Sequence, residues 1–156
     1  MLIKKQGLKK RLKKIKKDEI SKIKISDDHL LVLNYIDSQV DNGVFSVSEI
    51  TCPECNRMMN SINLSDYLIV EFCTFCRGLW FNVGELKDVT GLINDIPSQQ
   101  LKDRASRFKC PQCSIRIKEF VFKAPDNILI DSCVECHGVY LERDELKRIF
   151  KLLDKE

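Results

Sequence analysis

Eight cysteines constrain this chain more than any other feature of its sequence. They are Cys52, Cys55, Cys73, Cys76, Cys110, Cys113, Cys133 and Cys136, so every one of them belongs to a C-x-x-C pair. Such pairs occur in metal sites, in thiol redox proteins and in covalent haem attachment. The cellular compartment and the arrangement of the pairs along the chain decide among these chemistries.

The N-terminal residues indicate a reducing compartment. The start, MLIKKQGLKKRLKKIKKDEI, is basic but lacks the run of roughly 7–15 apolar residues that a secretory signal needs. No stretch approaches the roughly 18 apolar residues of a membrane span. We therefore expect a cytoplasmic protein with reduced thiols, in which paired cysteines bind metal or perform redox chemistry rather than form structural disulfides.

The second half of the chain repeats the first. A shift of sixty residues places CTFCRGLWF on CVECHGVYL, and a shift of 58 places CPEC on CPQC. Each unit therefore reads C-P-x-C, then 17 or 19 residues, then C-x-x-C, which is the spacing of a four-cysteine zinc site. Zn²⁺ favours a tetrahedron that four thiolates close completely. We expect two zinc ions, one in each unit, with all eight cysteines as ligands.

Ligand pairing within each unit is itself a prediction. The alternative joins the first C-x-x-C pair, which contains Cys52, to the last pair, which contains Cys133. That arrangement closes longer loops at a greater cost in chain entropy, while the local gaps already fit one metal.

Residues 133–137, CVECH, also spell a haem attachment motif. Haem would leave Cys110 and Cys113 unexplained, and the first unit has Arg77 where the second has His137. A site closed by four sulfurs needs no fifth ligand. We therefore interpret His137 as a surface residue.

The two units resemble the transcription factor IIB-like zinc finger family. The matching segments are CPEC, CTFCRGLWFNVGEL, CPQC and CVECHGVYLERDEL, within residues 51–91 and 109–150. The resemblance implies small, metal-stabilised, β-rich modules, namely two tandem four-cysteine zinc ribbons that are each followed by a short helix. It implies no particular activity. The sequence departs from the family pattern at Arg57 and Ser114, where a glycine is frequent, and at Tyr140, which replaces tryptophan.

Residues after the second C-x-x-C of each unit suggest how the ribbons pack. We expect Gly78 and Gly138 to adopt positive φ, which would let backbone amides approach the sulfurs. Trp80 and Tyr140 are expected to pack over the metal turns as a miniature core; stacking on nucleic-acid bases is the functional alternative.

Glu85 and Glu145 could be read as general bases beside zinc. The spelling Asn82-Val83-Gly84-Glu85 instead predicts a capping box, with Asn82 as N-cap and Glu85 reaching back. The same register holds for Glu142 and Glu145. A C-terminal helix should follow, with an apolar face made by Leu146, Ile149, Phe150 and Leu153.

We divide the chain into five segments. These are a basic arm (1–25), a short helical segment (26–50), the first ribbon (51–91), a polar linker (92–107), and the second ribbon with its C-terminal helix (108–156). Within the second segment, VFSVSEI fits either a strand or the start of another helix.

Charge is distributed unevenly along the chain. Residues 1–24 carry eleven Lys or Arg and two acidic residues, a net +9, whereas the remainder carries fifteen and twenty-one, a net −6. Neither ribbon is basic, so nucleic-acid contact would come from the arm, through phosphates. The candidate residues are Lys9, Lys10, Arg11, Lys13, Lys14, Lys16 and Lys17. A solvated tail is the structural alternative for this segment.

The sequence thus favours a non-catalytic, zinc-binding adaptor or regulatory protein. We expect a protein partner and contact with nucleic acid through the arm, and no small-molecule substrate. Two alternatives remain open. One is a thiol-based redox or zinc-release sensor. The other is an adaptor held at a membrane surface, because a cationic arm with interspersed Leu and Ile can lie on anionic lipid.

Overall fold

The computed structural model describes residues 29–156 apart from 66–67, 99, 124–127, 143 and 156. The predicted basic arm, with its seven candidate nucleic-acid contacts, lies outside the described residues.

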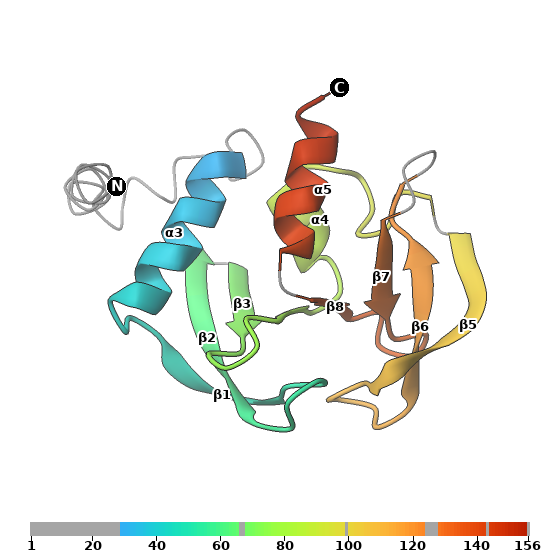
Figure 1. Cartoon of the computed structure of the whole chain (residues 1–156), viewed down its shortest axis with the longest axis horizontal. Coiled ribbons are helices and arrows are strands. Elements are labelled where there is room, and N and C mark those ends of the chain that lie inside the picture. The colour runs from blue at the N-terminus through green and yellow to red at the C-terminus, as the bar shows by residue number, and fades with distance from the viewer. Residues whose placement is uncertain (1–28, 66–67, 99, 124–127, 143, 156) are drawn as a thin grey trace.

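Eight strands form one antiparallel sheet that includes both units. The strands are β1 (Ser46–Thr51), β2 (Met58–Ser65), β3 (Leu68–Phe72), β4 (Leu79–Phe81), β5 (Gln100–Lys109), β6 (Arg116–Val121), β7 (Leu129–Ser132) and β8 (Val139–Leu141). Their order across the sheet is β1-β2-β3-β4-β8-β7-β6-β5. This order is symmetric about the central pair, in which β4 of the first unit joins β8 of the second. The two ribbons are β-rich and metal-binding as predicted, but they share one sheet instead of standing apart (Figure 1).

Among the described residues, three helices cover one face of this sheet (Figure 1). They are α3 (His29–Asp41), α4 (Glu85–Thr90) and α5 (Glu145–Leu153). Side chains alternate between the two faces of a strand. Along β4, Phe81 joins the core under the helices, whereas Trp80 joins the core around the cysteines on the other face. The described part of the chain has no helix that is long and apolar enough to cross a membrane.

Residues 29–51 form part of the first unit. Helix α3 buries Val32 and Ile36 in the core, and the ring of His29 stacks on Phe150 with centroids 4.3 Å apart. The segment VFSVSEI contributes β1, which pairs with β2, so the strand interpretation is the correct one.

The expected linker over 92–107 ends in a strand, because β5 occupies residues 100–109 and pairs with β6. β5 is an edge strand, and most of its described side chains are exposed, which fits its polar sequence. Among its described side chains, Ser106 and Phe108 are buried. Their counterparts at a shift of 58 are Ser48 and Ile50 in β1. In both strands the serine hydroxyl accepts a hydrogen bond from the amide two residues on, at 3.0 and 3.1 Å. The repeat therefore begins one strand before the first cysteine.

Candidate metal centres

All four C-x-x-C turns, here called knuckles, have the same backbone. In each, the residue after the second cysteine donates its amide to the carbonyl of the first cysteine, at 2.9–3.0 Å. That residue has positive φ in every knuckle: Asn56 57°, Arg77 66°, Ser114 61° and His137 60°. The shared turn brings both sulfurs of a knuckle to one side. His137 is therefore the equivalent of Arg77 at an exposed turn position, as the surface interpretation requires.

The expectation of positive φ at Gly78 and Gly138 was wrong. Positive φ falls one residue earlier, at Arg77 and His137. The glycines are needed for another reason, which is close approach of an aromatic ring. A Cβ at Gly78 would overlap the hydroxyl end of Tyr140, and a Cβ at Gly138 would overlap the six-membered ring of Trp80.

The eight cysteines gather into two clusters, one in each unit. Cys52, Cys55, Cys73 and Cys76 form the first cluster, and Cys110, Cys113, Cys133 and Cys136 form the second. Within each cluster all four sulfurs lie within 4.8 Å of one another. The grouping is the local one, and the alternative that joins the first and last knuckles is not present.

The sulfur geometry fits zinc. Four thiolates at about 2.3 Å from a tetrahedral Zn²⁺ lie about 3.8 Å apart. The distance from Cys52 Sγ to Cys76 Sγ is 3.6 Å, and that from Cys110 Sγ to Cys136 Sγ is also 3.6 Å. All eight thiols are free of disulfide bonds. Two zinc ions are therefore the cofactors that this donor set accommodates, and they would hold each pair of knuckles together.

Backbone amides donate hydrogen bonds to the sulfurs and lower the pKa of the thiols. The sulfur of Cys110 accepts from the amides of Gln112 and Cys113 at 3.4 and 3.3 Å. Burial nevertheless raises the pKa of Cys110 to about 12. In Cys133, burial acts to raise the pKa, but amide hydrogen bonds from Cys136 and Glu135, together with hydrogen bonds from the Cys110 and Cys136 thiols, leave the pKa lowered. Bound zinc requires all four thiolates, so metal affinity rises with pH.

Trp80 and Tyr140 are fully buried in the core around the cysteines, which confirms the prediction that they pack and excludes a stacking role on bases. Their partners were not foreseen, because each ring packs against the other unit. Tyr140, from the second unit, places its Oη 3.7 Å from Cys76 Sγ of the first cluster. The same hydroxyl donates to Glu54 of the first unit at 3.1 Å.

Polar contacts also join the two units at the knuckles. The guanidinium of Arg107 bridges Glu142 at 2.6 Å and Glu54 at 3.3 Å. The side-chain amide of Gln112 donates to Asn82 Oδ1 at 2.7 Å. Sequence reasoning missed these contacts between the units. The repeat could have revealed Arg107. If residues 100–109 are recognised as the counterpart of the strand before Cys52, the register of the repeat places Arg107 beside the knuckles.

The two glutamates assigned to helix capping do accept hydrogen bonds from backbone amides three residues earlier. Glu85 accepts from the amide of Asn82 at 2.7 Å, and Glu145 accepts from the amide of Glu142 at 2.6 Å. The assignment of Asn82 as N-cap was wrong, because α4 begins at Glu85 and its preceding residue, Gly84, has positive φ. The Asn82 side chain instead accepts from Trp80 Nε1 at 3.2 Å.

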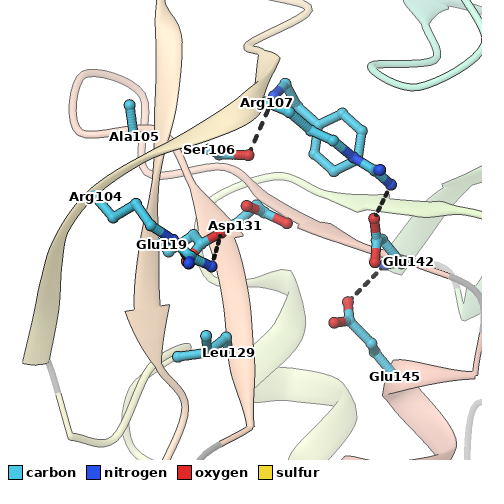
Figure 2. A pocket seen from close by; sticks show the side chains of 10 residues that line it. Arg104, Ala105, Ser106, Arg107, Glu119, Leu129, Asp131, Glu142 and Glu145 are labelled. Atoms are coloured by element: carbon cyan, nitrogen blue, oxygen red, sulfur yellow. Dashed lines mark hydrogen bonds and ion pairs between the residues drawn. The ribbon is translucent and has the colours of Figure 1, made fainter.

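Around the second cap lies a hollow of about 430 Å³, lined by β5, β6, β7 and the start of α5. Figure 2 shows Arg107 reaching Glu142, and Glu145 meeting the backbone of Glu142 from below. Burial raises the pKa of Glu145 to about 7. The polar groups lining the hollow are paired with each other, which fits a structural role for Glu145 at the helix start.

Comparison with known families agrees with the geometry. The sequence profile of the transcription factor zinc-finger family, a zinc ribbon of the TFIIB type, matches residues 51–90 and 109–152. The two matched segments make up more than half of the chain and each contains one cysteine cluster. Comparison with curated proteins and with solved structures gives no match. The chain therefore belongs to the transcription factor zinc-finger family and carries two tandem copies of its zinc ribbon.

Proposed function

We propose that this protein is a non-catalytic, zinc-held adaptor that contacts nucleic acid through its basic arm and a protein partner through its folded body. The observation that carries the non-catalytic part is the donor set. Each cluster offers four cysteine sulfurs to one metal, so bound zinc has no open position at which water or substrate could be activated.

The charge distribution supports separate binding roles for the basic arm and for the rest of the chain, here called the body. The arm carries +9 over residues 1–24, whereas the remaining residues carry −6. Two clusters of four thiolates around Zn²⁺ add further negative charge to the body. Phosphate contacts need cations, so an acidic body favours a protein partner and leaves nucleic-acid contact to the arm.

Aromatic stacking by the ribbons would require exposed rings. Trp80 and Tyr140 are buried and cannot serve. Phe75 is 65% exposed and carries the guanidinium of Arg57 4.0 Å above its ring. It is therefore the residue to substitute if nucleic-acid binding persists without the arm charges.

The test is fluorescence anisotropy with labelled single-stranded RNA and duplex DNA across a salt series, using full-length, zinc-loaded protein. One variant replaces Lys9, Lys10, Lys13 and Lys17 with Gln. Its matched control replaces four body lysines with Gln: Lys87, Lys109, Lys151 and Lys155. We expect only the arm variant to weaken binding. The dependence of log affinity on log salt should flatten by about 0.7–0.9 for each phosphate that the variant no longer neutralises.

Equal weakening in the arm variant and the control would contradict an arm-driven contact. Undetectable binding by the wild-type protein at low salt would remove the nucleic-acid proposal entirely. The family assignment and the zinc sites would stand in either case.

A further inference from the structure

The two zinc sites are joined by exchanged aromatic side chains. Tyr140 of the second unit lies against the knuckle of the first unit that contains Cys76 and Gly78. Trp80 of the first unit lies against Gly138, in the knuckle of the second unit that contains Cys136. The second knuckle of each unit therefore packs against a ring supplied by the other unit.

This exchange is sterically tight on both sides. A single methyl group at Gly78 or Gly138 would overlap the opposing ring. Both rings are fully buried, so either ring could move away only by displacing the side chains packed around it. Trp80 and Tyr140 are themselves direct partners across the β4–β8 ladder. Close-packed side chains of this kind transmit displacement instead of absorbing it.

The sheet makes the same connection through the backbone. β4 and β8 are three residues each, and each has the other unit as one of its two neighbours. If one unit unfolded, the remaining central strand would lose a partner and expose buried side chains such as Phe81 or Val139. Burial of that surface requires both units to be folded.

Zinc ribbons of this size fold when they bind metal, so their binding energy is folding energy. We propose that the two sites bind zinc with positive cooperativity, because folding of either unit builds the surface on which the other folds. The chain then populates the zinc-free and two-zinc forms in preference to the singly loaded form. It also loses both ions together, so the folded state of both units responds to the free zinc concentration in a single step.

Native mass spectrometry of the full-length protein tests this directly. Apo protein is titrated with chelator-buffered zinc until the chains hold an average of one bound ion each, and the zero-, one- and two-zinc species are counted. At that average, two identical, independent sites leave about half of the molecules with one ion by statistics alone, and independent sites of unequal affinity leave more. We expect a singly loaded fraction well below half. A fraction of half or more overturns the proposal.

Two variants test the route of the coupling. Gly138→Ala should force Trp80 away by steric overlap, and Trp80→Phe should remove the ring atoms that touch Gly138. Val134→Ala, at a 42% exposed position in the same knuckle, is the matched control. We expect the singly loaded fraction to rise at least twofold in both test variants and to stay unchanged in the control.

If Gly138→Ala fails to take up zinc, Trp80→Phe still decides the point, because it relieves packing without adding volume. An unchanged singly loaded fraction in Trp80→Phe overturns the aromatic route. Release into excess chelator provides a second readout. The wild-type protein should lose both ions in one kinetic phase, and two phases in the wild-type protein would contradict cooperative release.

Discussion

Trp80 and Tyr140 are paired directly opposite each other at the centre of the sheet, one from each unit. They hold equivalent positions in the repeat, so the contact joins the same position of the two units. Such a self-complementary contact is the kind that joins two copies of a protein around a twofold axis. Here the repeat supplies both copies in one chain, and the symmetric strand order about β4 and β8 follows from it.

The glycines beside these rings give the first prediction. Gly78→Ala should lower the free energy of unfolding of the zinc-loaded protein by roughly 1–3 kcal/mol, because the added Cβ overlaps the Tyr140 hydroxyl and the ring lies in a filled core. Urea denaturation at a fixed free zinc concentration measures the change. Thr74→Ala, at an exposed position in the same knuckle, is the control and should be nearly neutral. Equal stability of the two variants would contradict the close approach.

Helix α3 gives the second prediction, which concerns its attachment to the body. His29 stacks on Phe150 and its ring nitrogens contact Asp154 Oδ1 at 2.8 Å and the Thr90 carbonyl at 3.2 Å. His29→Ala should cost roughly 1–2 kcal/mol, since it removes a stacked pair and two hydrogen bonds.

Amide hydrogen exchange provides the measurement for His29→Ala. Protection should fall throughout α3 and in the last turn of α5. Leu30→Ala, at a side chain that is 66% exposed, is the control and should leave protection unchanged. Loss of protection confined to α3 alone would indicate that the helix is a separate element.

The metal sites could be predicted from sequence because their chemistry is local. Each C-x-x-C turn places two sulfurs together through its own backbone, and the repeat of the spacing reports the second site. The packed positions of Trp80 and Tyr140 were also predictable, since large aromatic side chains beside a small metal core are normally buried.

The arrangement between the units could not be predicted in the same way. β4 is three residues long, and nothing in LWF states which strand lies beside it. Strand β5 was hidden because Ser106 and Phe108 are its only described side chains that are buried. Gly138 stood out in the sequence, but the need for glycine there comes from the ring of Trp80, which lies far away in the chain. Contacts between distant segments leave no periodicity in either segment.

Asp95 gives the third prediction. It follows α4 in the chain, and its two carboxylate oxygens accept hydrogen bonds from the amides of Gly84 and Lys87, each at 2.8 Å. Asp95 therefore satisfies amides that Asn82 does not reach. Asp95→Ala should lower stability by roughly 1–2 kcal/mol through loss of the cap. Asp88→Ala, on the exposed side of α4, is the control and should lower stability less in thermal denaturation. An equal loss in both variants would mean that removal of a negative charge near α4, and not loss of the cap, lowers the stability.

His137 gives the fourth prediction, which separates zinc from haem. The residue occupies the exposed turn position after Cys136, as Arg77 does after Cys76. His137→Ala should therefore retain two zinc ions per chain by elemental analysis, whereas Cys136→Ser should lower the zinc content. The wild-type protein should show no haem absorbance when purified with haem present. Zinc loss in His137→Ala would show that the imidazole takes part in the second site.

Glu145 gives the last prediction, which concerns pH. Burial first, and then the nearby Glu142 and Asp131 carboxylates, raise the pKa of Glu145 to about 7 in the folded protein. An unfolded glutamate titrates near about 4.3. A raised folded pKa means that the folded state holds its proton more tightly. The contribution of Glu145 to stability is therefore fully present below about pH 4.3 and is lost as the pH rises through about 7.

Glu145→Gln isolates this contribution because a glutamine oxygen can still accept from the Glu142 amide while carrying no charge. Thiolate binding of zinc favours high pH in both proteins, so only their difference is informative. The stability of Glu145→Gln relative to wild type should increase between about pH 5 and pH 8, by a few kcal/mol at most. Urea midpoints at matched free zinc give the curve, with the exposed Asp88→Asn as the control. Parallel curves for Glu145→Gln and wild type would mean that this carboxylate ionises as freely in the folded protein as in the unfolded chain.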